Sequence, residues 1–432
     1  MKISGYRRAL IACCFLWASA PCAFAQESSI VIKKIDREEA ERLALLNNPS
    51  LLASLEEIAI AEQRLKMARH LLLPQLGFDA TATGFEAERS LVVSEGFGGV
   101  VLSPSDNRRL YLGRGTIEQV LYTGGKLRNA VVLAKAALEK ARSDRDRTTF
   151  RVIRDVRFAF LDALSAVEKE QLMESLAKEL ETLRPSSDQP GARLIWEDEK
   201  LELEELRDQT AAREKRQTVF ALLRSIGMDL SSEVRVTGRL DDQELPKKLP
   251  TLNESLSWAR EFRSEYRTEA LESEMNATQV AIALASRSPV VSLAGMSEFL
   301  GNEFPLRTNN WSGMLRVHLP FSWDNWATIR ERKAQQRKGQ VRRVEIDDAI
   351  GLEVRQAHFK LASQMGILSK RKEHVERWRE LYARARASMR STEDRLELYH
   401  RYKMARERYF EAQAAALRAR YEFEYAIGRD LP

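Results

Sequence analysis

Apolar and polar side chains alternate strictly along residues 311–321. The apolar positions include Trp311, Leu315, Val317 and Phe321, and the polar positions between them include Arg316 and His318. A period of two predicts a β-strand with one face in apolar surroundings and the other in water. Residues 111–121 alternate in the same way, with Tyr111 and Ile117 against Arg114, Thr116 and Glu118. Weaker alternation before each strand supplies partners, so we predict two hairpins, at about 76–122 and 290–321.

Long stretches with helical periodicity follow each hairpin. From Leu398 to Ala426 the apolar residues are spaced by four and three in turn, which predicts a coiled-coil seam whose alanines allow close helix approach. We predict two pairs of long helices, at about 126–227 and 326–428. Each helix would have roughly 40–60 residues and a length of about 60–90 Å. Turn-forming residues at 185–191 mark the tip of the first pair, and the second tip is expected near 388–394.

The chain repeats these signals in its two halves. Each half opens with a helix-capping box, followed at the same distance by a proline; the boxes are Asp36-x-x-Glu39 and Thr251-x-x-Glu254, and the prolines are Pro74 and Pro289. Each half also ends in an Ile-Gly-x-Asp-Leu segment, at 226–230 and 427–431. Such self-similarity predicts one fold built from two structural repeats, 26–250 and 251–432. Each repeat would hold a helix, a hairpin and a long helix pair, and a linker would end the first.

The first 25 residues are typical of an export signal. Basic residues precede an apolar run from Ala9 to Ala20, and Ala23-Phe24-Ala25 is a small-x-small cleavage site. We therefore expect a signal peptide, residues 1–25, cleaved after Ala25. The three cysteines, Cys13, Cys14 and Cys22, lie in or next to this segment, so no disulfide and no thiolate metal site is expected in the mature chain.

Charge and hydropathy exclude some classes of protein. The chain has 69 basic and 63 acidic residues, and three of the basic ones lie in the signal, so the high pI does not indicate nucleic-acid binding. The charges are spread along the predicted helices instead of forming a basic tail. No mature stretch approaches about 18 consecutive apolar residues, so no membrane-spanning helix is predicted.

No catalytic constellation is found in the sequence. The histidines are scattered and none is paired at helical spacing: His70, His318, His358, His374 and His400. Gly124-Gly125-Lys126 lacks the spacing of a phosphate-binding loop, and is expected to let the chain turn from strand to helix. We therefore expect no enzyme, no metal site and no cofactor.

Taken together and in order, these motifs resemble the TolC-type outer-membrane efflux proteins over nearly the whole mature chain. The residues that carry the resemblance are Asn48-Pro49-Ser50-Leu51, Ala61, Ala68-Arg69, Leu73-Pro74-Gln75-Leu76, Gln119-Val120-Leu121-Tyr122-Thr123-Gly124-Gly125-Lys126, Val156-Arg157-Phe158-Ala159-Phe160, and the endings at Gly227 and Gly428. The resemblance implies an α+β membrane protein that forms a homotrimer. Each chain would give four strands to a shared 12-stranded transmembrane β-barrel, and its helices to a long periplasmic coiled-coil barrel.

The same resemblance implies an outer-membrane exit duct of a tripartite efflux or type I secretion system. Its expected partners are a periplasmic adaptor protein, an inner-membrane transporter and outer-membrane lipid, with no nucleic acid. The physical argument agrees, because four strands cannot close a barrel and open sheet edges are not tolerated in lipid. The predicted location is the outer membrane, with the helical part in the periplasm.

Residues can be assigned to the surfaces of such a duct. The barrel lumen is expected to be lined by Arg114, Thr116, Glu118, Arg316 and His318, and the lipid to be faced by Tyr111, Ile117, Trp311, Leu315, Val317 and Phe321. The helix tips would contact the adaptor through Arg193, Leu194, Glu197, Arg390, Ser391, Glu393 and Asp394. Two alternatives stay open: an exported soluble periplasmic coiled-coil scaffold, and a binding protein anchored by a lipid on Cys22.

Overall fold

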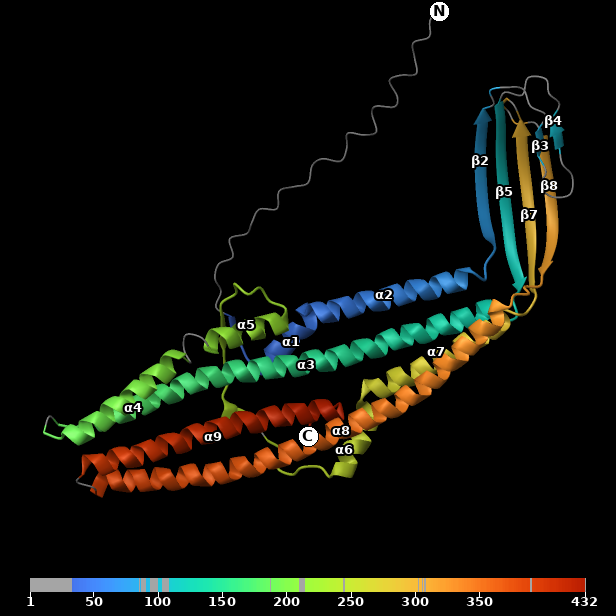
Figure 1. Ribbon diagram of the computed structural model, residues 1–432. Coiled ribbons are helices and arrows are strands. Elements are labelled where there is room, and N and C mark those ends of the chain that lie inside the picture. The colour runs from blue at the N-terminus through green and yellow to red at the C-terminus, as the bar shows by residue number, and fades with distance from the viewer. Residues whose placement is uncertain are drawn as a thin grey trace, which may run out of the picture.

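The computed structural model shows a long helical body with a β-sheet at one end (Figure 1). The described residues are 33–84, 86, 91–93, 100–102, 109–186, 188–209, 214–243, 245–301, 303–304, 306, 308–388 and 391–431. The predicted signal peptide with its cleavage site and Cys22 lies outside this part of the chain, and so does Arg390.

Four strands form one antiparallel sheet in the order β2-β5-β7-β8. Their bounds are β2 (Gln75–Gly84), β5 (Arg109–Tyr122), β7 (Val290–Gly301) and β8 (Thr308–His318). Each predicted hairpin is present, and pairing of β5 with β7 joins the two hairpins into a single sheet. Two short strands, β3 (Leu91–Val93) and β4 (Val100–Leu102), pair within the long connection of the first hairpin.

The last strand is shorter than the alternation predicts. β8 ends at His318, so Phe321 lies beyond the sheet. Pro320 accounts for the difference, because proline has no N–H to donate to a neighbouring strand.

Most of the chain is helical. The first half holds α1 (Arg37–Asn47), α2 (Pro49–His70), α3 (Lys126–Glu181), α4 (Pro190–Gln209) and α5 (Lys215–Ile226). The second half holds α6 (Leu252–Phe262), α7 (Ser264–Ala285), α8 (Asp324–Ser388) and α9 (Thr392–Ile427). The returning helix of the first pair is described in two parts, α4 and α5, and residues 210–213 between them lie outside the described part of the chain. Among the described helices, none combines the length and hydropathy required to span a membrane.

The capping signals act as their sequences predict. The Asp36 carboxylate accepts a hydrogen bond from the Glu39 amide at 2.8 Å, and Thr251 and Glu254 form a reciprocal capping box. The Asn48 side chain accepts from the Ser50 amide at 2.9 Å, with Pro49 at the first helical position. These caps start the short helix α1, the longer helix α2 and the short helix α6. In each half a short helix thus precedes a longer one.

The strand-to-helix turn at Gly124 and Gly125 requires glycine. Their φ angles of +61° and +90° lie in the left-handed region, and a Cβ on Gly124 would overlap the Ser288 side chain. The turn therefore lets the chain leave β5 and enter α3 within three residues, next to the link between α7 and β7.

The last helix of each half, α5 or α9, stops against the corner between the first two helices of the same half. Gly227 ends α5 with φ +72° beside Asn47 and Asn48, and Gly428 ends α9 with φ +74° beside Phe262 and Arg263. In each case the amide two residues after the helix bonds back five residues, Met228 to Leu223 at 3.0 Å and Arg429 to Glu424 at 3.2 Å.

Side chains from the corners complete both helix ends. The Asn48 side chain donates to the Ser225 carbonyl at 2.7 Å, and the Arg263 guanidinium donates to the Tyr425 and Ala426 carbonyls at 3.2 and 3.3 Å. These bonds satisfy carbonyls that the helix itself leaves without partners.

A feature that the sequence did not predict joins the two ends of the first half. β1 (Lys33–Ile35) pairs in parallel with β6 (Val234–Val236), and the short 3₁₀ helix η2 (Leu240–Asp242) follows. Ile35 and Leu240 are buried in the largest apolar cluster, together with Phe160 of α3 and Ile226 of α5. This cluster fixes the middle of the helical body.

Candidate functional site

The register of the sheet separates its side chains into two faces. Ile117 lies opposite Leu76 on one side and Gly295 on the other, and Trp311 lies opposite Ser297. We call this side the apolar face, and its larger members are Leu76, Phe78, Tyr111, Ile117, Leu293, Phe299, Trp311, Leu315 and Val317. Trp311 and Leu76 are each 79% exposed in the single chain. A row of large apolar side chains left open to this extent indicates a surface that is covered in the working state.

The opposite side, which we call the polar face, carries the charged residues of the sheet. Arg114, Thr116 and Glu118 of β5 share it with Arg316 and His318 of β8. The Arg114 Nε donates to Glu298 Oε1 of the neighbouring strand at 2.8 Å, and Asp79 lies opposite Arg114 in the register with the other neighbouring strand. Leu110, Leu112 and Leu300 interrupt this face at the end of the sheet farthest from the helices.

The structure therefore brings the residues of each predicted set together. The five expected lumen residues lie on the polar face, and the expected lipid-facing residues in the strands lie on the apolar face. Phe321 is the exception, since it follows the strand and contacts Trp323 at 5.7 Å between ring centroids. Tyr111 packs its ring 4.9 Å from that of Phe304 in the link after β7.

Two edges of the sheet are open. β2 and β8 are each paired on one side only within this four-stranded sheet. Such edges expose rows of backbone N–H and C=O groups that can pair with a further strand. Within this four-stranded sheet, the outer edges of β2 and β8 are thus unpaired, and the large side chains of the apolar face are exposed.

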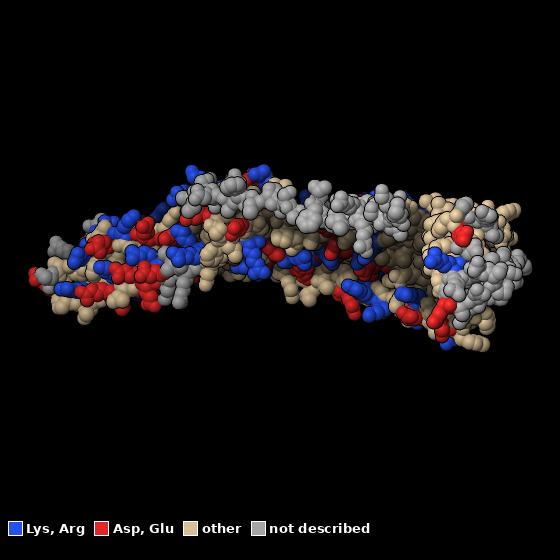
Figure 2. Space-filling view, turned by 90° about the horizontal axis from the view of Figure 1, so that it is seen from above, with Lys and Arg blue, Asp and Glu red and all other residues tan. Residues whose placement is uncertain are grey.

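The body behind the sheet has a different surface. Figure 2 shows Lys and Arg intermingled with Asp and Glu along the helices, whereas the visible part of the sheet end has few charges. Among the ion pairs on the body, Arg418 to Asp162 at 3.2 Å and Lys360 to Glu422 join different helices. A mixed-charge surface of this kind is typical of helices in water.

The predicted tip residues lie at the end of the body opposite the sheet. Arg193, Leu194 and Glu197 are exposed on the first turns of α4, where Arg193 pairs with Glu197 at 3.0 Å and Leu194 is 69% exposed. Ser391 caps α9 by accepting from the Asp394 amide at 3.4 Å. A Cβ on Gly191 would lie 2.6 Å from Glu393 Oε1, so the two tips are in contact.

Buried aromatic residues near the tips make contacts within each helix pair and between the two pairs. The Trp196 Nε1 donates to the Leu180 carbonyl at 3.1 Å, and the Tyr399 hydroxyl donates to the Leu176 carbonyl at 2.8 Å. Tyr382 of α8 stacks on Tyr402 of α9 with ring centroids 5.2 Å apart. Burial raises the pKa of Tyr399 far above its ordinary value, so this hydroxyl remains a donor at any ordinary pH.

A charged cluster that sequence reasoning missed lies next to these aromatics. Lys403 of α9 is completely buried, and its ammonium donates to Glu199 at 2.8 Å and Glu202 at 2.6 Å, both on α4. His400 bonds to the other oxygen of Glu199. Burial would lower the pKa of Lys403, but the hydrogen bonds that its ammonium donates to the two carboxylates raise the pKa above its usual value.

The two carboxylates and His400 could form a set of metal ligands, because their ligand atoms lie within 4.8 Å of one another. The Lys403 ammonium already supplies the positive charge between the carboxylates. The arrangement is therefore a buried ion-pair network that ties α4 to α9. The sequence held no signal for it, since Glu199 and Lys403 are separated by about 200 residues and look like ordinary helix-surface charges.

Comparison with known proteins agrees with this geometry. Residues 41–183 match the family model described as outer membrane efflux protein, which confirms the resemblance found in the sequence. No curated protein sequence matches the chain.

Solved structures extend the similarity of fold to 91% of this chain. The open-state MtrE outer membrane channel of Neisseria gonorrhoeae has a TM-score of 0.76 at 18% identity, over 89% of its own chain. The CmeC outer membrane channel of Campylobacter jejuni has the same TM-score at 14% identity, over 85% of its chain. The outer membrane protein VceC of Vibrio cholerae has a TM-score of 0.72 at 15% identity, over 96% of its chain. The fold of the chain is thus that of these outer membrane proteins.

Proposed function

We propose that this chain, which matches the outer membrane efflux proteins over residues 41–183, is one third of an outer-membrane exit duct. Three copies would join their four-stranded sheets into a closed 12-stranded barrel, and their helices into a tube in the periplasm. Export would be diffusion through the aqueous lumen. Energy would come from an inner-membrane transporter, to which a periplasmic adaptor protein connects the duct.

The observation that carries this proposal is the two-faced sheet with open edges. A transmembrane barrel needs an apolar outer face, a polar inner face and no free edge. The apolar face of this sheet supplies the first requirement, and the polar face with its Arg114–Glu298 pair supplies the second. Pairing of β8 of one copy with β2 of the next would remove the free edges.

A duplicated architecture also supports the proposal. α1 and α6 have 11 residues each, α2 and α7 have 22 each, and the last helix of each half, α5 or α9, stops at a glycine. We propose that the chain consists of two structural repeats, 26–250 and 251–432, so that a trimer contains six similar units. Six units around one axis would give a nearly symmetric tube from three chains.

The first experiment tests assembly. We would extract the full-length protein from membranes in mild detergent, measure the mass of the complex, and wash a parallel sample in high salt. A trimer that needs detergent is the expected result. A monomer or dimer released by salt alone would refute the duct and favour a periplasmic scaffold.

The second experiment tests which face meets lipid. Val317→Asp places a charge on the apolar face, whereas Thr116→Asp and Ser312→Asp place the same charge on the polar face. We expect the Val317 variant to lose outer-membrane assembly because a charge facing lipid is costly, and the two controls to assemble. Equal assembly of all three variants, measured as heat-modifiable trimer in membranes, would refute the assignment of the faces.

We further propose that the adaptor binds the tips, through Arg193, Leu194 and Glu197 on α4 and Ser391, Glu393 and Asp394 on α9, with Arg390 between the helices. Exposed charges at the end of the body support this role. Because the mature chain is expected to lack cysteine, Arg193→Cys and Arg390→Cys give unique crosslinking sites. A crosslink to an adaptor during export is expected from both sites, and none from Lys338→Cys, an exposed position in the part of α8 nearer the sheet. Crosslinking from Lys338→Cys alone would contradict the tip assignment.

A further inference from the structure

The segment between the two halves crosses the body as an irregular chain that bends at Lys247 and Lys248 and is anchored at both ends. It runs from Leu245 to Pro250, between η2 and α6, and passes the end of α9 midway along the helical body, far from the sheet and from the tips (Figure 1). Leu245 packs against the central apolar cluster, and Leu249 packs against the cluster formed by α8 and α9. The Pro250 carbonyl lies 2.9 Å from His358 Nε2.

The main chain between these anchors is open. Among the backbone hydrogen bonds of the described residues, none involves the peptide groups of Lys247, Lys248 or Leu249. Pro246 and Pro250 limit the conformations of the segment without occupying its amides. The segment therefore presents, in a defined place, peptide groups that no other backbone group of the described residues occupies.

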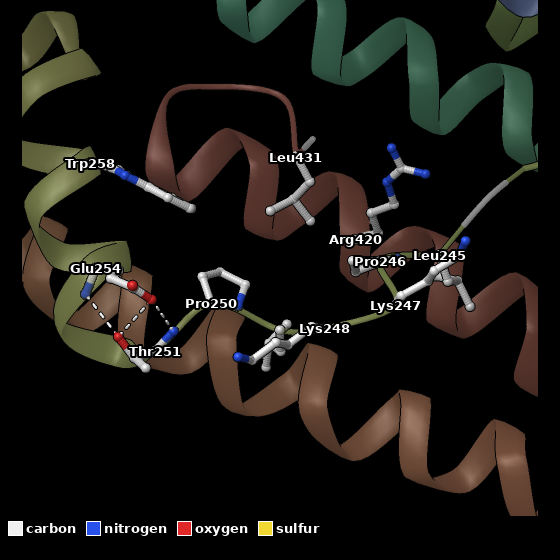
Figure 3. Close-up of a pocket in the computed structure, with 11 residues that line it drawn as sticks. Leu245, Pro246, Lys247, Lys248, Pro250, Thr251, Glu254, Trp258, Arg420 and Leu431 are labelled. Carbon is white, nitrogen blue, oxygen red and sulfur yellow. Dashed lines mark hydrogen bonds between the residues drawn. The ribbon is translucent and has the colours of Figure 1, made fainter.

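A cavity of about 630 Å³ lies beside this segment. Figure 3 shows Trp258 of α6, Leu431 and Arg420 on the side of the cavity opposite Lys248 and Pro250. Trp258 is partly buried beneath the Arg429 guanidinium, 4.8 Å from its ring, and Leu431 is buried. Trp258 and Leu431 thus give the cavity an apolar wall.

The charges around the cavity are mainly positive. Lys247 and Lys248 are exposed, and in the described part of the chain neither forms an ion pair with a carboxylate. The Glu254 carboxylate is occupied by the Thr251 amide and hydroxyl, both at 2.8 Å, and these bonds together with Lys248 lower its pKa. Arg420 is bonded to Glu424 at 2.9 Å. The exposed ammonium groups of Lys247 and Lys248 are thus available to pair with the carboxylates of a ligand.

We propose that this groove, made up of residues 247–249 and the cavity beside them, binds an extended acidic segment of a partner protein. The main chain of the segment would pair with the open peptide groups, its carboxylates would meet Lys247 and Lys248, and an apolar side chain between them would enter the cavity against Trp258. Alternation of acidic and apolar residues fits a strand, because successive side chains point to opposite sides. This site is separate from the tips, so it does not depend on adaptor binding.

The test uses the full-length protein in detergent and fluorescent peptides of seven residues. The probe alternates Glu and Leu; its controls alternate Lys and Leu, or carry N-methyl groups at alternate amides. We expect the Glu-Leu peptide to bind, and both control peptides to bind at least ten-fold more weakly. Charge reversal by Lys247→Glu with Lys248→Glu should weaken binding at least ten-fold, since both side chains are exposed and tolerate substitution. The matched control, Lys370→Glu with Lys372→Glu on the exposed surface of α8, should bind as the wild type does.

Three outcomes would overturn the proposal. Equal binding of the N-methylated peptide would mean a simple anion-attracting surface that does not use the main chain. Unchanged binding after reversal of Lys247 and Lys248 would place the peptide elsewhere. A disulfide between copies formed by Lys248→Cys in the assembled protein would mean that a second copy of the chain covers the groove. Each outcome leaves the mass of the detergent complex unchanged, so failure here is distinguishable from failure of the proposed duct.

Discussion

The glycines that end α5 and α9 give a quantitative prediction about the central body. Gly227→Ala places a Cβ in the left-handed region, which costs about 1–2 kcal/mol. The new methyl group would also overlap the Asn47 carbonyl oxygen, which belongs to the backbone of the corner between α1 and α2. Overpacking of this kind costs about 1–3 kcal/mol more. We therefore expect Gly227→Ala to reduce the free energy of unfolding by about 2–5 kcal/mol per chain.

Two other glycines provide the scale for this measurement. Gly428→Ala has the same left-handed backbone, but its Cβ would lie 3.1 Å from the nearest atoms, so a smaller loss of about 1–3 kcal/mol is expected. Gly366 lies inside α8 with no atom within 4 Å of a new Cβ. Gly366→Ala should therefore stabilise the protein by about 0.5–1 kcal/mol.

The assay is urea denaturation of the detergent-solubilised protein at fixed concentration, followed by far-ultraviolet circular dichroism. The expected order of midpoints is Gly366→Ala above wild type, then Gly428→Ala, then Gly227→Ala. If Gly227→Ala unfolds with the wild-type midpoint, the corner between α1 and α2 does not press against the end of α5 as described.

Two further predictions concern titratable groups in the helical body. Lys403→Met should destabilise the junction of α4 with α9 by about 3–5 kcal/mol, because it leaves the buried Glu199 carboxylate without its cation. Faster limited proteolysis at the tip would measure this loss. Lys360→Met on the surface is the control, and its proteolysis rate should equal that of the wild type. Desolvation and the hydrogen bond to Asp347 raise the pKa of Tyr266 from 10.0 to about 12, so the folded state holds this proton more tightly. The stability from this bond is complete below pH 10 and is lost as the pH rises through 12, and Tyr266→Phe should remove that part of the alkaline dependence of the melting temperature. A Tyr266→Phe protein whose alkaline dependence equals that of the wild type would refute this linkage.

Much of the fold could be predicted because its determinants are local. Alternation along residues 311–318 fixes a strand and its faces, and the cap at Asn48 fixes a helix start, without knowledge of any distant residue. The strand end at His318 was missed by three residues because the alternation continues through Pro320, whose missing N–H outweighs the pattern.

Features that depend on distant pairs were not predictable. β1 and β6 have three residues each and no pattern of their own, and they exist because residues about 200 apart pair with each other. The Lys403 cluster is of the same kind, since a lysine on a charged helix looks solvated until the opposing helix is placed. The groove beside Trp258 also joins three separate elements, α6, α9 and the segment between the halves.

The equal lengths of α2 and α7 have a consequence for the sheet. Both helices have 22 residues, both start from a corner of the central body, and both lead through links of equal length, 71–74 and 286–289, into β2 and β7. The equal lengths of the two helices therefore set the two hairpins at the same distance from the central body. One extra turn in α7 alone would move β7 along β5 by about 5.4 Å, between one and two residues of a strand. A slip of one residue exchanges the apolar and polar faces, so the register of the sheet is set by helix length in another part of the molecule.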